Sequence, residues 1–158
     1  IIDIIQTVAP YFNDFYLLPD ENNSLKLRWT DKFSEHIYGV NNLSDGTIRF
    51  IALTVLFMQP KLPKIIILDE PELGLHPVAI ANLADLILSI KDESQIIMAT
   101  QSVELINNFE QEDIITVDNI DGESVFKRLD TIDLSNWISD YGIGVLWKNN
   151  IINNGQPQ

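Results

Sequence analysis

The sequence predicts an α/β domain built around a parallel β-sheet. Two short apolar runs, at residues 64–68 and 95–100, lack the alternation of a half-exposed strand, which is typical of strands covered on both faces. An amphipathic helical pattern at 77–90 lies between them, and an almost uncharged helical pattern at 47–58 precedes them. Helices and strands in this order favour a parallel sheet with helical crossovers.

The segment before the sheet is predicted to contain a helix and a hairpin. Residues 1–8 form the end of a helix that Pro10 stops. Apolar residues at 15–18 and 25–29 flank the turn-forming stretch 19–23, which indicates a hairpin. A polar loop at 41–45 leads into the helix at 47–58, whose only charged residue is Arg49, so we expect this helix to be largely buried.

The crossover helix and the C-terminal elements follow from local signals. Pro77 is a residue type favoured in the first turn of a helix, and the apolar residues 80, 83, 84, 87 and 88 share one face. A short helix is expected at 103–107. Segments 113–117 and 124–128, joined around Asp121 and Gly122, predict a second hairpin. A last helix is expected at 133–141, with Gly142 as its cap.

The composition fits one globular domain. The chain has 158 residues, 46% of them hydrophobic, so we expect a single domain over 1–158 with a frayed polar tail at 153–158. No apolar run approaches the ~20 residues of a spanning helix. No secretion signal is recognisable and cysteine is absent, which fits a cytoplasmic protein without membrane contact.

The charge argues against nucleic-acid binding by this segment. The net charge is −13, and the 10 basic residues form no dense run. Affinity for nucleic acid comes mainly from phosphate neutralisation by clustered Lys and Arg. Direct DNA or RNA contact is therefore disfavoured here, although another part of the complete protein could supply it.

Asp69 and Glu70 are the first candidate site residues. They directly follow the strand at 65–68, and ligands of open α/β sheets bind beyond the carboxyl ends of the strands. Asp69 can support Mg²⁺, and Glu70 can orient or deprotonate a water that attacks a phosphate. The alternative is that two acids merely end a strand and begin a turn.

A second candidate is the stretch from Ser44 to Thr47. Ser44 is a good helix N-cap, and Gly46 lets the backbone approach a ligand closely. The free N–H groups of a helix N-terminus suit phosphate. A plain N-cap without a ligand is the alternative.

Two further loops contain polar candidates. Thr100, Gln101 and Ser102 follow the second strand, with a strand-to-helix loop capped by Ser102 as the alternative. Residues 71–77 include His76 before the crossover helix. A single histidine of this kind is more often an exposed loop residue than a ligand, and no metal-ligand spacing surrounds it.

Together, these segments resemble the C-terminal half of an ABC-type ATPase head, which has a P-loop NTPase fold. Residues 43–47 resemble the signature motif, 65–70 the Walker B strand, 71–76 the D-loop and 100–102 the switch position. The stretch 69–77 is most similar to AAA-type ATPases of the RecF/SMC/OLD group, several of which accompany anti-phage defence modules and toxin-like partners. The resemblance covers residues 1–151.

The resemblance implies ATP and Mg²⁺ as cofactors and a homodimer that closes around ATP. Asp69 would support Mg²⁺, Glu70 would be the general base, and Gln101 would sense the γ-phosphate and help to place the water. A possible effector protein, in a DNA-related or defence role, would respond to dimerisation.

The same resemblance implies a second set of residues that act on the partner's nucleotide. Ser44 and Gly46 would contact the γ-phosphate of ATP held by the opposite subunit. Asp45 lies in the same motif, and its carboxylate is expected to point away from the phosphate. His76 would face the partner from the D-loop.

Three departures from the family pattern bear on activity. No G-x-x-x-x-G-K-[ST] occurs in the sequence, so this chain alone should bind ATP poorly. Asp45 and Thr47 replace the Gly and Gln that are usual in transporter signatures. Gln101 replaces the usual switch histidine and cannot take up a proton, which predicts slow turnover. A catalytically incomplete interaction module and a transporter ATPase subunit remain the alternatives to an ATP-driven dimerising engine.

Overall fold

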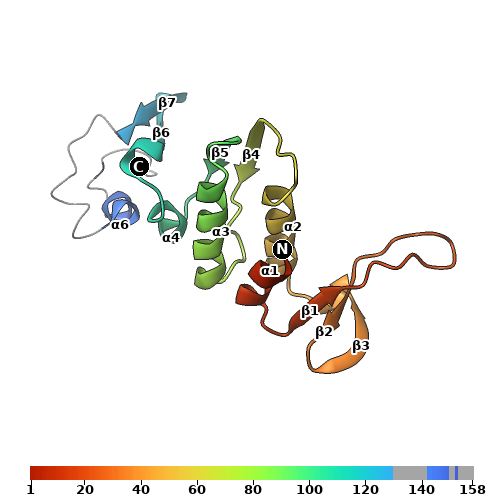
Figure 1. The fold of residues 1–158 in the computed structure, drawn as a ribbon. Helices are drawn as coiled ribbons and strands as arrows, with labels where there is room; N and C mark the ends of the chain where they lie inside the picture. Colours follow the sequence, from red (N-terminus) through yellow and green to blue (C-terminus); the bar gives the residue numbers. More distant parts are fainter. Residues whose placement is uncertain (130–141, 150–151, 153–158) are drawn as a thin grey trace. The chain divides into compact units, whose positions relative to one another are not determined.

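The computed structural model describes residues 1–129, 142–149 and 152, in two compact units of residues 1–98 and 99–158 (Figure 1). The first unit contains, in order, α1 (Ile2–Val8), β1 (Phe12–Phe15), β2 (Arg28–Asp31), β3 (Ser34–Gly39), η1 (Val40–Asn42), α2 (Asp45–Phe57), β4 (Ile65–Asp69), α3 (Pro77–Ser89) and β5 (Gln95–Ala99), whose last residue falls in the second unit. The second unit continues with α4 (Val103–Ile106), η2 (Gln111–Asp113), β6 (Ile115–Ile120), β7 (Glu123–Arg128) and α6 (Ile143–Lys148).

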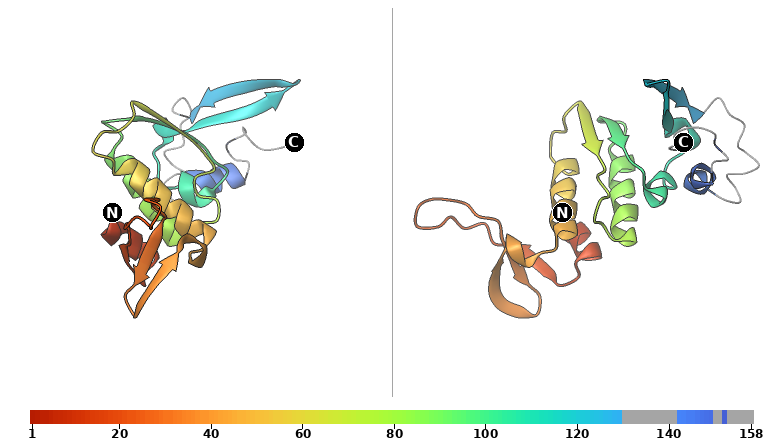
Figure 2. Two further views of the ribbon diagram at one scale, coloured as in Figure 1. Left: turned by 90° about the vertical axis from the view of Figure 1, so that its right-hand side faces the viewer. Right: turned by 180° about the vertical axis from the view of Figure 1, so that it is seen from behind.

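The predicted strand–helix–strand unit is present. β4 pairs with β5, and α3 forms the crossover between these two parallel strands (Figure 2). The bounds of α3 agree with the prediction, and its buried residues include Ile80, Leu83 and Ile87. α2 begins at Asp45, two residues before its predicted start, with Ser44 as the predicted N-cap.

The expectation that both strands are covered on two faces is wrong for the described chain. Ile66 of β4 is buried, whereas Ile65 and Ile67 are 54% and 74% exposed, and Ile97 of β5 is 50% exposed. α2 and α3 lie on the same side of the strands (Figure 2), so no described helix of the first unit covers the other face. The β-branched run indicates how apolar the strand is, but it does not indicate how many helical layers this chain places against the sheet.

The burial of the helix α2 is also less complete than the sequence predicts. Phe50, Leu53 and Phe57 of α2 are buried, but Val55 and the C-cap Met58 are 42% and 40% exposed. The helix packs against α1 and α3 on its buried side. Its exposed apolar stripe shows that composition alone does not determine how many sides of a helix are covered.

The N-terminal hairpin is confirmed, but its strands lie further from the turn than predicted. β1 and β2 pair antiparallel with Phe15 opposite Trp29, and β3 adds a third strand that the sequence did not predict. The predicted strand residues Leu17, Leu18 and Leu25 are exposed in the loop. They have no core to face, whereas the aromatic residues beyond them do.

The turn at 19–23 is organised by Asp20. Its carboxylate accepts hydrogen bonds from the backbone N–H groups of Asn22 and Ser24, at 3.0 and 2.9 Å. The hydrogen bond from Ser24 is the largest cause that lowers the pKa of Asp20, and Lys26 at 3.6 Å adds to it. The turn therefore forms from local contacts, as its residue types predict.

The sheet of β1–β3 packs against α1 and α2 through an aromatic core. Trp29 stacks on Phe12 at 5.6 Å and on Tyr38 at 4.9 Å between ring centroids. Ile5 of α1 and Ile51 of α2 complete this cluster. Burial of such large side chains supplies about 1.5–3 kcal/mol each, which anchors the start of α2.

The second unit contains the predicted short helix and hairpin. α4 is capped by Ser102, and β6 pairs with β7 across Asp121 and Gly122, which have φ angles of 52° and 86°. This geometry fits the two-residue turn expected for Asp-Gly. The helix predicted at 133–141, with its cap, and the tail at 153–158 lie outside the described residues; Gly142 is the N-cap residue of α6.

None of the helices in the described residues is both long and apolar enough to cross a membrane. The single domain expected over residues 1–158 stays a prediction.

Candidate functional site

The carboxylates of Asp69 and Glu70 lie at the carboxyl end of β4, as predicted. Asp69 is the last residue of the strand and is exposed, and Glu70 is half-buried at the start of the following turn. Neither carboxylate has a hydrogen bond or ion pair within the part of the chain that the structure describes. Both groups are therefore available to a cation or a water molecule.

Glu70 has an unusual backbone conformation. Its φ angle is 42°, in the left-handed region, which it shares among the described non-glycine residues only with Asn23 and Asp121. Asn and Asp tolerate this region, but Glu gains nothing from it and loses about 1–2 kcal/mol. Strain of this kind collects at functional sites, where the surrounding structure enforces it.

This strain leads to a prediction about stability. Replacing Glu70 by Gly removes the left-handed penalty of about 1–2 kcal/mol but adds a backbone-entropy cost of about 0.5–1 kcal/mol. We expect Glu70→Gly to be as stable as wild type or up to about 1.5 kcal/mol more stable, measured by thermal unfolding of the nucleotide-free protein. The exposed turn residue Asp92, whose φ is not positive, is a matched control, and Asp92→Gly should lower stability. Equal destabilisation by both variants would contradict the strained geometry.

The start of α2 forms the second part of the site. Ser44 Oγ accepts a hydrogen bond from the Thr47 backbone N–H at 3.1 Å and lies 2.8 Å from Thr47 Oγ1. Ser44 and Asp45 are exposed, whereas Thr47 is buried. The predicted N-cap role of Ser44 is thus confirmed. The first backbone N–H groups of a helix have no partner within the helix and suit an anion.

The start of α2 lies directly against the turn that follows Glu70, which we call the 70–75 turn. A Cβ placed on Gly46 would be 2.3 Å from the carbonyl oxygen of Gly74, so no larger residue fits there without a shift. In the next turn of the helix, Arg49 Nη1 donates a hydrogen bond to the Glu70 carbonyl at 3.0 Å. Two candidate segments that are far apart in sequence, 43–47 and 69–75, are therefore in contact.

His76 and Gln101 lie in separate local settings. His76 is exposed and caps α3, with its Nδ1 accepting a hydrogen bond from the Val78 N–H at 3.4 Å. Gln101 belongs to the second unit, directly after β5, and is exposed. Next to it, Ser102 accepts a hydrogen bond from the Leu105 N–H at 3.2 Å, which confirms the capping interpretation.

In the sequence, Arg49 is distinguished only as the single charged residue of an apolar helix. That isolation was the available signal, because a lone cation in such a helix needs a partner elsewhere in the fold. The partner, a backbone carbonyl, leaves no trace in the sequence.

The carboxylates fit Mg²⁺ in combination with phosphate oxygens. The described residues contain no cluster of three or more metal-ligating side chains. Mg²⁺ commonly uses one or two carboxylates together with waters and substrate phosphates, so Asp69 and Glu70 suffice for such a role. The sequence lacks a loop that would cradle the phosphates themselves.

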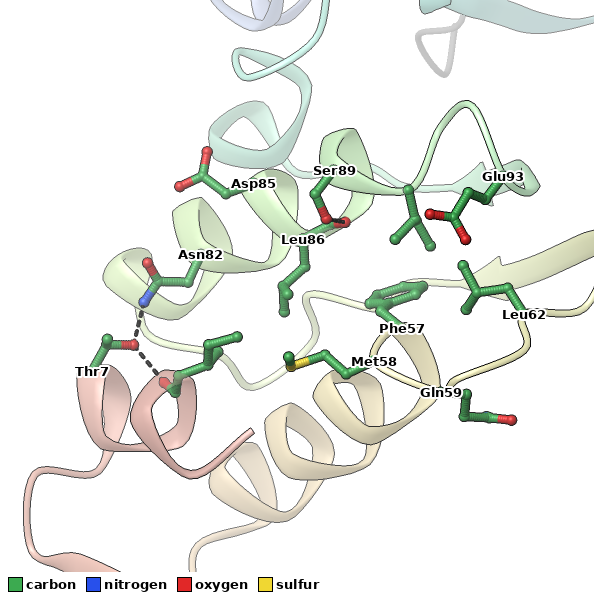
Figure 3. A pocket seen from close by; sticks show the side chains of 12 residues that line it. Thr7, Phe57, Met58, Gln59, Leu62, Asn82, Asp85, Leu86, Ser89 and Glu93 are labelled. Carbon is green, nitrogen blue, oxygen red and sulfur yellow. Dashed lines mark hydrogen bonds between the residues drawn. The ribbon is translucent and has the colours of Figure 1, made fainter.

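A groove of the first unit lies elsewhere. It measures about 590 Å³ and lies among α1, α2, α3 and the loop after α2 (Figure 3). Thr7 and Asn82, which are joined by a 2.7 Å hydrogen bond, lie at one side of it. None of the predicted site residues lines this groove.

Comparison with known families matches the stretch that contains every predicted site residue. Residues 10–107 match the family described as "AAA domain, putative AbiEii toxin, Type IV TA system". A curated relative from Mycoplasma genitalium, described as "Putative ABC transporter ATP-binding protein", is 35% identical over 104 residues, which cover 64% of this chain. The match covers only 28% of that relative's length.

Solved structures show the same fold. One, from work on ATP-driven dimerization and DNA-stimulated activation of SMC ATPases, has a TM-score of 0.66 and 19% identity, over 98% of this chain and 89% of that chain. The Smc head domain of Pyrococcus furiosus, bound to the C-terminal domain of ScpA, has a TM-score of 0.64 and 22% identity, over 88% of this chain and 36% of that chain. The fold is thus the mixed α/β fold of P-loop NTPases, as in SMC heads.

Proposed function

The chain belongs to this family of AAA domains and is an ABC/SMC-like P-loop ATPase domain, and we propose that it is the half of an ATP-hydrolysing head that supplies the catalytic base. The observation that carries the proposal is the geometry of Glu70. Its carboxylate, which has no partner among the described residues, lies beside Asp69 at the end of β4, in a strained turn that contacts the start of α2.

The residues of one subunit would act on its own nucleotide. Asp69 supports a hydrated Mg²⁺, which supplies charge neutralisation at the β- and γ-phosphates when bound. Glu70 orients the attacking water and accepts its proton. Gln101 donates a hydrogen bond to the water or the γ-phosphate, but it cannot take up a proton, which favours slow turnover.

The start of α2 would act on the nucleotide of a second copy. Ser44 and the backbone N–H groups near Gly46 donate to the γ-phosphate, while Asp45 points away from it. His76 lies at the facing surface. Two copies then enclose two ATP molecules, which makes dimerisation depend on ATP.

The uncovered sheet face suggests where the phosphate-binding loop would come from. Ile65, Ile67 and Ile97 expose apolar surface at the open face of β4 and β5. We propose that a segment carrying the phosphate-binding loop covers this face and completes the site. In this proposal, the two units belong to one head domain. The complete protein works in the cytoplasm without a membrane partner.

The solved relatives include SMC ATPases with ATP-driven dimerisation, and heads bound to a domain of ScpA. By analogy, closure of the dimer would be transmitted to an effector protein or to DNA. The chain's net charge of −13 favours a protein effector at this segment.

A mixing experiment tests the two-copy site. Ser44→Arg should abolish turnover of the complete protein, because a bulky cation replaces the group that faces the partner's nucleotide. A one-to-one mixture of Ser44→Arg and Glu70→Gln proteins should regain about a quarter of wild-type turnover, since half of the dimers are mixed and each has one intact site.

Each variant alone is the control and should be inactive. A mixture that stays inactive, although subunit exchange is demonstrated, would place Ser44 and Glu70 in the same site. Ser44→Arg with normal turnover would remove the signature role altogether.

A specific observation favours a second candidate function. The sequence contains no phosphate-binding loop, which suits a catalytically incomplete interaction module. In that case the complete gene product binds no ATP. The relative described as a transporter ATP-binding protein keeps a third candidate, a transporter subunit, for which co-purification with a membrane protein is the test.

A further inference from the structure

Arg49 is the only basic residue of α2, and its contact is not explained by folding of the helix itself. After the first turn the helix is otherwise uncharged. Within the described part of the chain, no carboxylate pairs with Arg49. Its guanidinium instead donates to the backbone carbonyl of Glu70, 21 residues away, at 3.0 Å.

This carbonyl belongs to a glutamate with a left-handed φ of 42°. The Glu70 carbonyl oxygen also accepts a hydrogen bond from the Leu73 N–H at 3.1 Å, so two donors hold it. The orientation of this carbonyl and the direction of the Glu70 side chain are set by the same Cα. A charged donor on the oxygen therefore helps to fix the direction in which the Glu70 carboxylate leaves the end of β4. Its hydrogen bond offsets part of the free-energy cost of the left-handed backbone.

A second contact secures the other end of the 70–75 turn. The backbone of Gly46 lies against the carbonyl of Gly74, with no room for a side chain between them. α2 thus contacts the turn at both ends, through Gly46 and Arg49. Ser44 lies at the start of the same helix, so one helix connects Ser44 with both contacts to the turn.

We propose that Arg49 is a positioning residue that holds Glu70 in its catalytic orientation and couples it to the start of α2. This inference rests on the proposed function, because it assigns Arg49 a role through the base. Arg49 does not contact the reacting atoms. It links the start of α2, which would face the partner's nucleotide, with Glu70, which would act on the subunit's own nucleotide.

The test compares Arg49→Met and Arg49→Lys in the complete protein. Met keeps length and apolar stem but has no donor, so kcat should fall about 10- to 100-fold, as expected for a misplaced catalytic group. The KM for ATP should stay within about threefold of wild type, because binding contacts are unchanged. Lys can still donate to the carbonyl, so Arg49→Lys should regain most of kcat.

Arg28 offers a matched control. Its Nη2 donates to the Leu18 carbonyl at 2.6 Å, in the hairpin and away from the site. Arg28→Met removes the same kind of hydrogen bond and should leave kcat per folded molecule unchanged.

A double variant separates positioning from a general structural role. If Arg49 acts through Glu70, Arg49→Met should lower turnover no further in a Glu70→Gln background. The inference is overturned if Arg49→Met keeps kcat within about twofold of wild type, if it raises KM alone, or if it lowers turnover equally in both backgrounds. Failure of the proposed function looks different, because then wild type has no turnover or Glu70→Gln retains it.

Discussion

Replacing Glu70 by Gln is expected to lower ATP turnover of the complete protein by about 10²-fold or more. The amide keeps the size of the side chain but cannot accept a proton from the attacking water. ATP binding should survive, because Asp69 and the phosphate contacts are unchanged. The variant should therefore accumulate as an ATP-bound dimer, seen as a shift to twice the mass in size-exclusion chromatography with light scattering.

Glu93 provides the control for the loss of one negative charge. It is exposed in the turn before β5 and lines the groove among the helices, away from the site. Glu93→Gln should turn over ATP normally and remain sensitive to nucleotide in the same way as wild type. Normal turnover by Glu70→Gln would remove Glu70 as the base.

Replacing Gly46 by Ala is expected to have the largest effect on stability. Alanine normally stabilises a helix relative to glycine by about 0.5–1 kcal/mol. Here the added Cβ would lie 2.3 Å from the Gly74 carbonyl oxygen, and a forced shift of packed backbone costs about 1–3 kcal/mol. The clash exceeds the gain, so the thermal unfolding midpoint should fall by several degrees, at about 2–4 °C per kcal/mol.

Gly39 is the matched control for this substitution. A Cβ there would have a single neighbour, the Asn42 side-chain oxygen at 4.0 Å, and the φ angle of −84° suits any residue. Gly39→Ala should leave the midpoint unchanged or slightly raised. A Gly46→Ala protein as stable as Gly39→Ala would show that α2 and the 70–75 turn do not make the close contact described above.

Features that depend on neighbouring residues could be predicted from the sequence. The N-caps at Ser44 and Ser102, the position of Asp69 and Glu70 at the carboxyl end of β4 and the turn at Asp121 and Gly122 all follow from local chemistry, and the structure confirms them. Pro77 likewise marks the first residue of α3. Such signals determine where an element begins or ends, because the relevant contacts span only a few residues.

Features that depend on distant contacts could not be predicted. The strand β3 follows a turn at Lys32 and Phe33 that contains no glycine or proline, and its place in the sheet is set by its pairing with β2 and the stacking of Tyr38 on Trp29. The one-sided covering of β4 depends on which helices this chain supplies. The hydrogen bond from Arg49 to Glu70 joins a side chain to a backbone carbonyl, and a carbonyl is present at every residue.

The candidate site itself was predicted in part. Placement of Asp69 and Glu70 at a strand end is confirmed, but the roles of the site residues stay predictions. The strain at Glu70 was not foreseen, since a left-handed glutamate arises only when surrounding contacts enforce it.

Mg²⁺-dependent ATP turnover, measured on the complete gene product and on this 158-residue chain side by side, tests the proposed function most directly. We expect turnover by the complete protein that Glu70→Gln abolishes, and an inert short chain, because the chain lacks the loop that cradles the phosphates. A complete protein that neither hydrolyses nor binds ATP would rule out the proposed function and would leave the catalytically incomplete interaction module.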